Sequence, residues 1–262
     1  MSFPHAKEHN IVINFLSVYN HYNAKAELAS NQTIKGVQNM CGRYTITVTM
    51  EELMLRYLTN DSTIEHYAPK YNAAPMQLIP AVINTGTSNK LGELRWGLVP
   101  SWAKDDKIGS KMINARAESL LDKPSFKRLV SSRRCIIPSD GFYEWKQHGS
   151  TKQPMRIVMR DGGIFSMAGL YDIWTDPEGN KLSTCTIITT TPNELMAEIH
   201  NRMPVILKPE DEAAWLSRDQ QNSAELMELL QPYDPDQMRA YPVSPAVGNV
   251  RNDTKELIQE VI

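Results

Sequence analysis

From Met40 to the C-terminus, the chain consists of short segments rich in β-branched and aromatic residues, separated by turn residues. Such segments are typical of β-strands. One of them alternates in the manner of a half-buried strand and contains Trp96, which we expect in the core. The segments expected to form strands are 43–48, 78–84, 94–98, 134–138, 155–159, 164–170 and 184–190.

Helices are expected singly between these strands. Thr49 precedes a segment with acidic residues in its first turn, which predicts a helix over 51–58. Further helices are predicted over 192–200, 209–216 and 223–230. Because helices and strands do not alternate regularly, the pattern favours an α+β fold over a doubly wound parallel sheet.

The first part of the chain differs from the rest in its pattern of hydrophobic residues. Residues 1–39 show no sustained hydrophobic period, and their best apolar run, 11–19, is interrupted by Asn14. We interpret 1–39 as an N-terminal extension and 40–262 as one domain. No apolar run approaches the roughly 20 residues of a membrane span, so no membrane partner is expected.

Charge and cysteine content exclude several classes of protein. A formal net charge of -2 offers no general attraction to polyanions, so any DNA binding must depend on locally placed Arg and Lys. The 3 cysteines form no C-x-x-C pair, which disfavours disulfides and a structural zinc site. We expect a cytoplasmic protein without metal or cofactor, with Cys135 and Cys185 as inert core residues. No heptad or large apolar stripe demands a partner, so a monomer is expected.

Cys41 directly follows Met40. If translation begins at this methionine, its removal leaves a cysteine with a free α-amine beside its thiol. The amine, with an ordinary pKa of about 7.7 to 8.0, can form an imine with an aldehyde, and the thiol can then close a five-membered thiazolidine ring. The plainer interpretation is that Cys41 is a small apolar residue at the start of a strand.

Two further side chains are candidates for proton transfer. Glu144 lies between Tyr143 and Trp145, a setting that raises a carboxyl pKa and suits acid/base chemistry. Taken alone, a carboxylate paired with a nearby Arg is the more common explanation. His200 ends a predicted helix close to Arg202, where a lone histidine is more often a cap or surface residue.

Amides and aromatics provide weaker signals. Asn72 and Asn114 each stand in small-residue segments and are explained by turns or caps. Trp102 follows a proline and is a candidate for stacking on nucleic-acid bases. The basic residues near it are Lys104, Lys107 and Lys111.

Taken together in their order, several motifs resemble the SOS-response-associated peptidase (SRAP) family, whose members sense abasic sites and crosslink to single-stranded DNA. The resemblance covers nearly everything from Met40 onward. The motifs are Cys-Gly-Arg-Tyr at 41–44, Tyr-Asn-Ala-Ala-Pro at 71–75, Trp-Gly-Leu-Val-Pro-Ser-Trp at 96–102, Ile-Asn-Ala-Arg-Ala-Glu at 113–118, Asp-Gly-Phe-Tyr-Glu-Trp at 140–145, Ile-His-Asn-Arg-Met-Pro at 199–204 and Val-Ser-Pro-Ala-Val-Gly-Asn-Val at 243–250.

The resemblance implies a single domain with a mainly antiparallel, strongly curved sheet or barrel and flanking helices. It implies that Cys41 is an N-terminal nucleophile that forms a thiazolidine with an abasic sugar, and that Asn114 holds the cysteine amine. Glu144 would assist ring opening and crosslink reversal, and His200 would protonate the sugar oxygen. The residues implied to bind the DNA strand are Arg43, Asn72, Pro75, Trp102, Arg116, Trp145 and Arg202.

The departure from the family pattern is the segment before Met40, which places the α-nitrogen of Cys41 in a peptide bond. Translation can begin at Met40, the segment can be removed by proteolysis, or the protein is inactive. Two other functions are also open: a cysteine hydrolase that uses the amine of Cys41 as its base, and a single-stranded DNA-binding module without a covalent step.

Overall fold

A closed ring of strands forms the core of the computed structural model, which describes residues 41–59 and 62–262. Each strand hydrogen-bonds to the next in the order β10-β4-β3-β6-β9, and β9 pairs again with β10 to close the barrel. Both faces of β6 are buried. The barrel strands are β3 (Leu78–Asn84), β4 (Asn89–Trp96), β6 (Arg134–Ser139), β9 (Phe165–Thr175) and β10 (Lys181–Thr190).

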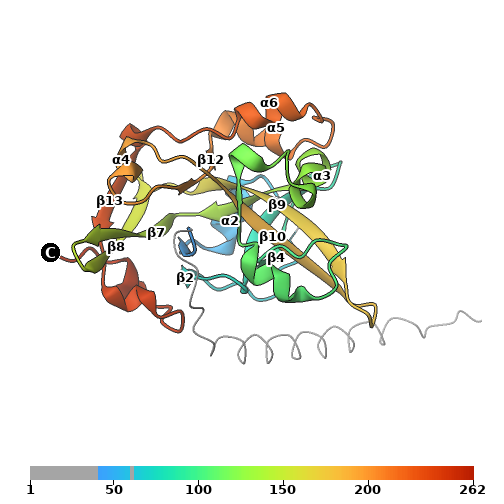
Figure 1. Cartoon of the computed structure of the whole chain (residues 1–262). Helices are drawn as coiled ribbons and strands as arrows, with labels where there is room; N and C mark the ends of the chain where they lie inside the picture. Colours follow the sequence, from blue (N-terminus) through green and yellow to red (C-terminus); the bar gives the residue numbers. More distant parts are fainter. Residues whose placement is uncertain (1–40, 60–61) are drawn as a thin grey trace, which may run out of the picture. The chain divides into compact units, whose positions relative to one another are not determined.

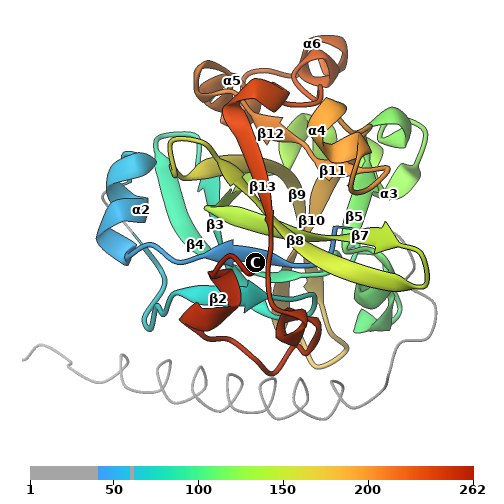
Figure 2. The ribbon, with the colours of Figure 1, turned by 90° about the vertical axis from the view of Figure 1, so that its left-hand side faces the viewer.

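A second, 5-stranded sheet runs in the order β13-β8-β7-β1-β2, and Figure 2 shows β13 at its edge, across β8. All of its pairings are antiparallel. Its strands are β1 (Tyr44–Ile46), β2 (Lys70–Ala73), β7 (Gly141–His148), β8 (Thr151–Met159) and β13 (Met238–Pro242).

Short strands and helices complete the fold (Figure 1). The strands β5 (Asn114–Arg116) and β11 (Met203–Pro204) pair with β10, and β12 (Ile206–Leu207) pairs with β9. The helices are α2 (Met50–Arg56), α3 (Pro124–Ser132), α4 (Glu194–Ala197), α5 (Glu212–Leu216) and α6 (Ser223–Glu228).

The expected α+β class with a curved, mainly antiparallel sheet is confirmed. Among the named strands of the described ranges, only the pairings of β10 with β4 and with β5 are parallel. Thr49 begins α2 through a capping box: its hydroxyl accepts the Glu52 N–H, and the Glu52 carboxylate accepts the Thr49 N–H. Trp96, Cys135 and Cys185 are buried in the core, as expected.

Several boundaries differ from the sequence-based prediction. The strand expected over 94–98 extends back to Asn89 and ends at Trp96, because Gly97 adopts a φ of 134° and turns the chain away. The strand expected over 43–48 is limited to Tyr44–Ile46. The elements β2, β5, β7, β11, β12, β13 and α3 were not predicted.

The described residues from Cys41 onward belong to one compact unit that spans 39–262. The expected extension, 1–39, lies outside the described residues. Among the residues that are described, no helix has the length and apolar character needed to cross a membrane.

Candidate functional site

Cys41 lies just before β1, with its side chain buried. Nδ2 of Asn114, the first residue of β5, donates a hydrogen bond to the Cys41 carbonyl oxygen at 2.9 Å. The Cys41 Sγ atom lies 3.9 Å from the carbonyl oxygen of Arg202. Cys41 is therefore held between β5 and the turn that follows α4.

The register of β1 against β7 brings Glu144 to Cys41. Tyr44 pairs with Phe142, and the Tyr143 N–H donates to the Arg43 carbonyl at 3.0 Å. Because side chains alternate along a strand, Glu144 points to the same side as Phe142, which packs in the main core. The Glu144 side chain is consequently shielded, with the residue 2% exposed.

Burial raises the pKa of Glu144 to about 7, while the charge of His200 limits the rise. Among the described residues, its Oε1 atom has no hydrogen-bond partner. This oxygen lies 3.8 Å from Nδ1 of His200. A carboxyl group with a pKa near neutrality can both donate and accept a proton at physiological pH.

His200 is positioned by the end of α4. The Asn193 side chain caps this helix by accepting the Met196 N–H at 2.9 Å, and the His200 N–H donates to the Met196 carbonyl at 2.7 Å. Nδ1 of the imidazole lies 3.2 Å from the Arg202 nitrogen and 3.1 Å from the Arg202 carbonyl oxygen. The backbone of this turn therefore fixes the orientation of the ring.

Arg202 is tied down by its guanidinium group. Its Nη1 and Nη2 donate to Glu118 Oε1 and Oε2 at 2.7 and 3.0 Å, and Nη2 also donates to the Thr189 carbonyl at 2.7 Å. The hydrogen bonds from Arg202 lower the pKa of Glu118. Because the Arg202 backbone contacts both Cys41 and His200, this bidentate pair fixes the turn that lines the site.

The Cys41 thiol is protonated at neutral pH, because burial raises its pKa well above the ordinary value and the Glu144 carboxylate raises it further. Single donor atoms of Cys41, Glu144 and His200 lie within 4.8 Å of one another. A thiol, a carboxylate and an imidazole are also ligand types of zinc, so the cluster has the composition of a metal site as well as that of a proton-transfer site.

Asn72 on β2 is buried, and its amide is fully engaged. Its Nδ2 donates to the carbonyl oxygens of Val247, Asn249 and Asn252 at 3.1, 3.1 and 2.8 Å. Its Oδ1 accepts from Arg43 Nη1 at 3.1 Å, and Arg43 also donates to the Val247 carbonyl at 2.9 Å. These two side chains thus join β1 and β2 to the C-terminal turns.

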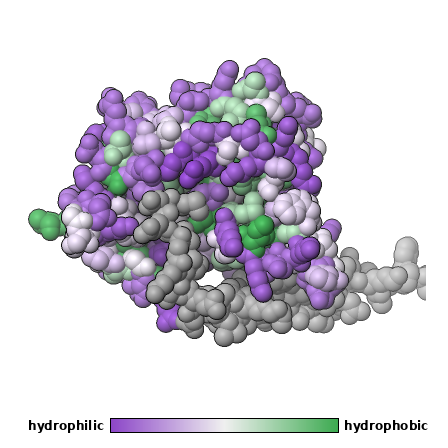
Figure 3. Space-filling model, viewed as in Figure 1, coloured by the Kyte–Doolittle hydropathy of each residue, from purple (hydrophilic) through white to green (hydrophobic). Residues whose placement is uncertain are grey.

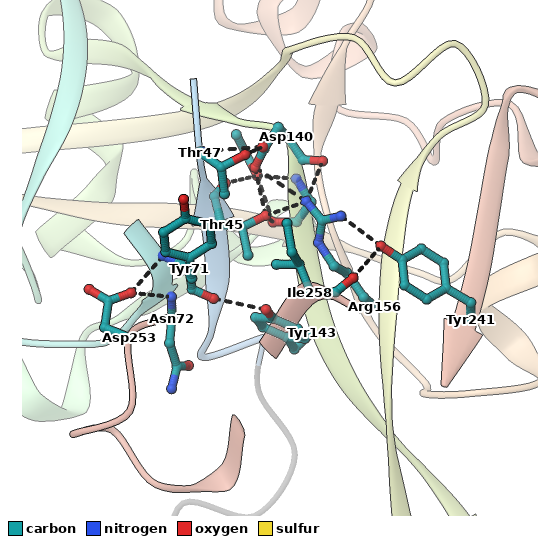
Figure 4. Close-up of polar contacts among 12 residues, drawn as sticks. Thr45, Thr47, Tyr71, Asn72, Asp140, Tyr143, Arg156, Tyr241, Asp253 and Ile258 are labelled. Atoms are coloured by element: carbon teal, nitrogen blue, oxygen red, sulfur yellow. Dashed lines mark hydrogen bonds and ion pairs between the residues drawn. The ribbon is translucent and has the colours of Figure 1, made fainter. Parts of the chain in front are cut away.

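Figure 4 shows a second link to the same C-terminal turns. Oδ1 of Asp253 accepts the backbone N–H groups of Tyr71 and Asn72 at 2.6 and 2.9 Å. The Tyr143 hydroxyl donates to the Tyr71 carbonyl at 2.8 Å, which ties β7 to β2. The strand that carries Glu144 is therefore braced from the side opposite the barrel.

A buried polar network locks β1 to β7 and β8 (Figure 4). The Asp140 carboxylate accepts from the Thr45 hydroxyl at 2.6 Å and from the hydroxyl of Thr47. Arg156 lies 3.5 Å from Asp140 Oδ1 and donates to Thr45 Oγ1 at 2.9 Å and to the Tyr241 hydroxyl at 2.7 Å. Because β1 is so short, these side chains reinforce the register that aligns β1, which follows Cys41, with the strand that carries Glu144.

The other residues expected to bind DNA are more dispersed. Pro75 follows β2 and is half-buried, and Trp145 is half-buried against a small second core cluster. Arg116 is exposed on β5, opposite Thr189 of β10. Trp102 is 59% exposed.

The structure brings Cys41, Asn114, Glu144 and His200 together, and it joins Arg202 to them through its backbone. Arg43 and Asn72 form a separate group at the C-terminal turns. Sequence reasoning did not assign roles to Glu118, Asp140 or Asp172. Asp140 and Asp172 are buried, whereas Glu118 is exposed. Each has a partner that lies away from it in the sequence, so only the fold reveals the pairing.

Known proteins share both sequence and fold with this chain. The profile of the SOS response associated peptidase (SRAP) family matches residues 40–250. The chain is 53% identical over 222 residues to the abasic site processing protein YoqW of Bacillus subtilis (strain 168), an alignment that covers 84% of this chain and 99% of YoqW. It is 36% identical over 225 residues to the abasic site processing protein HMCES of Gallus gallus, with 73% of this chain and 66% of HMCES aligned.

The fold comparison agrees with the sequence comparison. A crystal structure of a protein from Bacteroides thetaiotaomicron superposes with a TM-score of 0.78 at 30% identity, and the match covers 85% of this chain and 100% of that protein. Family profile, relatives and fold all coincide over the region that contains the Cys41 cluster. The chain therefore belongs to the SRAP family.

Proposed function

We propose that this chain senses abasic sites in single-stranded DNA and forms a covalent thiazolidine crosslink through Cys41 as an N-terminal residue. One observation carries the proposal: the Cys41 thiol, the Glu144 carboxyl and the His200 imidazole each offer an atom within 4.8 Å of the others. The relatives named above are abasic site processing proteins, which supports the same substrate.

The chemistry begins with the open-chain form of the abasic sugar, which presents an aldehyde. The neutral α-amine of Cys41 attacks the aldehyde carbon, and loss of one water gives an imine. The thiol then adds across the C=N bond, with sulfur bonding to carbon and the thiol proton passing to nitrogen. This step closes the five-membered ring.

Proton transfer is assigned to Glu144 and His200. Opening of the sugar needs a proton on the ring oxygen, which His200 supplies with Glu144 as its acid/base partner. The pKa of Glu144, about 7, leaves both protonation states populated near neutral pH. The same carboxyl group assists the reverse reaction, in which the thiazolidine reopens.

Asn114 orients the nucleophile. Its Nδ2 donates to the Cys41 carbonyl, while its Oδ1 is buried without a hydrogen-bond partner among the described residues. A buried acceptor of this kind is costly unless a donor arrives. We assign that donor to the N–H of the Cys41 amine and of the adduct formed from it.

The crosslink competes with strand cleavage. The imine makes the C2′ proton of the sugar acidic, so that β-elimination of the 3′ phosphate becomes accessible. Ring closure by the thiol removes the imine and suppresses this elimination. An abasic-site lyase activity is therefore the expected side reaction, and it increases when the thiol is lost.

The reaction requires a free α-amine on Cys41. The family match begins at residue 40, and removal of Met40 from a chain begun there exposes this amine. Release of the preceding segment by the protein itself, with the Cys41 thiol as nucleophile, is the second route, and it would give the protein a peptidase activity. Either route yields the same aminothiol.

For the bound strand, we propose contacts with a few locally placed residues instead of a general electrostatic attraction. The face seen in Figure 3 is mainly hydrophilic, and its apolar side chains form small separate groups. We propose that the protein acts as a monomer in the cytoplasm, at the nucleoid when bound to DNA, without a metal. The residues assigned to the DNA strand are Arg43, Pro75, Trp102, Arg116, Trp145 and Arg202, and Asn72, which is buried, acts on the DNA indirectly by holding Arg43.

The test uses protein that begins at Cys41 and single-stranded DNA with one abasic site. We expect a shifted band that survives denaturant, that is absent with intact DNA, and that is lost in Cys41→Ala. Binding that denaturant abolishes would favour the non-covalent module. Peptide turnover without DNA would favour the hydrolase.

A further inference from the structure

The loop that carries Trp102, residues 97–105, is held rigidly against the barrel. At its start, the Gly97 N–H donates to the Cys185 carbonyl and the Val99 N–H donates to the Thr184 hydroxyl, both at 2.8 Å. Near its end, the indole N–H of Trp174 donates to the Ala103 carbonyl at 2.8 Å. The exposed ring of Trp102 is therefore presented from a fixed backbone.

A buried carboxylate anchors the middle of this loop. Asp172 on β9 is 3% exposed, and its Oδ2 accepts the Ser101 N–H at 2.8 Å. Its Oδ1 accepts the Ile173 N–H at 3.0 Å. Asp172 therefore has a backbone donor on each oxygen before any cation is considered.

Arg128 on α3 joins the same carboxylate from the solvent side. Its Nη2 donates to Asp172 Oδ2 at 2.6 Å and to the hydroxyl of Ser101. The Arg128 side chain remains 53% exposed. Among the described residues, its Nε and Nη1 groups have no hydrogen-bond partner, so these donors face solvent next to the residue that precedes Trp102.

The Trp102 loop and the Cys41 cluster are attached to the same strand. Thr184 of β10 holds Val99 of the loop, and Thr189 of β10 holds the guanidinium of Arg202. With a rise of about 3.4 Å per residue, these two points lie roughly 17 Å apart along the strand. A single strand of DNA with its abasic nucleotide at Cys41 thus reaches the loop within a few nucleotides.

We propose that Arg128 binds a backbone phosphate of a nucleotide next to the abasic site, while the base of that nucleotide stacks on Trp102. The proposal rests on the function proposed above. Asp172 fixes one edge of the guanidinium and leaves the other edge for the phosphate oxygens. An aromatic face with an adjacent fixed cation is the arrangement by which proteins hold single strands without reading their sequence.

The competing explanation is that Arg128 only neutralises Asp172. In that case its solvent-facing donors have no role, and replacing it would alter stability but not the response of DNA binding to salt. A phosphate contact, in contrast, releases counterions. Its loss reduces the magnitude of the slope of log affinity against log salt by about 0.7 for single-stranded DNA.

The experiment measures binding of intact single-stranded oligonucleotides by fluorescence anisotropy over a series of salt concentrations. For Arg128→Gln we expect a dissociation constant about fivefold higher at low salt and a salt slope smaller in magnitude by about 0.7. Lys127→Gln is the matched control, since Lys127 is an exposed cation on the same helix. Arg128→Lys should retain most of the salt slope because the charge remains.

A second arm locates the contact. Oligonucleotides with one abasic site are shortened either on the 5′ or on the 3′ side of that site. The rise in dissociation constant caused by Arg128→Gln, called the penalty here, is expected to vanish for one of the two shortened forms and to remain for the other. The crosslinking rate at saturating DNA should not change in Arg128→Gln. Equal salt slopes in Arg128→Gln, Lys127→Gln and the parent protein would overturn the proposal, as would a penalty that survives both truncations.

The two proposals fail separately. If the parent protein forms no crosslink with abasic DNA but the Arg128→Gln penalty on intact DNA is present, the covalent function is wrong and the strand contact stands. If crosslinking occurs and the penalty is absent, the strand contact is wrong and the covalent function stands.

Discussion

Oε1 of Glu144 lies 3.8 Å from Nδ1 of His200, and this buried oxygen has no hydrogen-bond partner among the described residues. This oxygen therefore lies close to a second proton-transfer group without accepting a hydrogen bond from any described residue. Burial, the dominant influence, raises the pKa of Glu144 to about 7. The pair is poised to exchange a proton with a bound substrate near neutral pH.

The pH dependence of crosslinking follows from this arrangement. The α-amine must be neutral, and its ordinary pKa is about 7.7 to 8.0, whereas Glu144 must be protonated and has a pKa of about 7. We expect a bell-shaped rate profile with its maximum between these values. In Glu144→Gln the rate should be low, and the decline set by the pKa of Glu144 should disappear, because the amide cannot exchange a proton. A decline centred near pH 7 that persists in Glu144→Gln would show that another group sets it.

The same carboxyl group affects stability in a defined direction. Its pKa is about 7 in the folded protein, whereas the ordinary value, which applies to the unfolded chain, is 4.5. The folded state therefore binds the proton more tightly. The free energy of unfolding should therefore fall as pH rises from about 4.5 to about 7. Above pH 7, Glu144→Gln should be more stable than the parent by up to about 3 kcal/mol, and below pH 4 the difference should be small. Denaturant unfolding at several pH values measures this, and a constant difference would contradict it.

Asn114 should matter for chemistry more than for binding. Its amide holds the Cys41 carbonyl at 2.9 Å, so Asn114→Ala releases the nucleophile from its aligned position. Misplacement of about 1 Å can cost roughly 100-fold in rate, and we expect crosslinking at saturating DNA to slow by about 10- to 100-fold. Anisotropy should show an unchanged affinity for intact single-stranded DNA. A loss of affinity with an unchanged rate would assign Asn114 to the strand instead.

Asp140 should be a major contributor to stability. It pairs with buried Arg156 and accepts from Thr45 and Thr47. Asp140→Asn leaves the Arg156 cation uncompensated, which typically costs about 3 to 5 kcal/mol. Thermal unfolding should show a midpoint lower by about 10 °C, whereas the exposed Asp122→Asn control should show little change. Equal midpoints for the two variants would mean that the network is not stabilising.

Sequence alone predicted elements with a strong local signal. The strand Leu78–Asn84 was predicted to the residue, and the helix after Thr49 was predicted from its acidic first turn. The helix α3 was missed although Phe126, Leu129 and Val130 follow helical spacing, because Lys, Arg and Ser dominate the segment. The strand β7 was missed because its aromatic first half is buried on both faces and lacks alternation.

The candidate site was predictable only in part. The aromatic neighbours of Glu144 indicated a raised pKa from the sequence, and the family motifs singled out Cys41, Asn114 and His200. The pairing of Arg202 with Glu118, and of Arg128 with Asp172, joins residues distant in the sequence. Such contacts depend on strand order and register, which short-range patterns do not specify.

Cys41→Ala separates the two activities of the proposed aminothiol. With a free N-terminus retained, this variant still carries an amine that can form an imine, but it lacks the thiol that closes the ring. We expect no stable adduct and residual cleavage at the abasic site on denaturing gels. An adduct that survives denaturant in Cys41→Ala would assign the covalent bond to another residue.

The most direct test of the central claim is the intact mass of the adduct between protein begun at Cys41 and an abasic oligonucleotide, recorded with and without borohydride. We predict a mass equal to the sum of the two components less one water, unchanged by borohydride because the thiazolidine contains no imine. A mass that rises by two hydrogens on reduction, or an adduct whose attachment maps outside Cys41, would contradict the account.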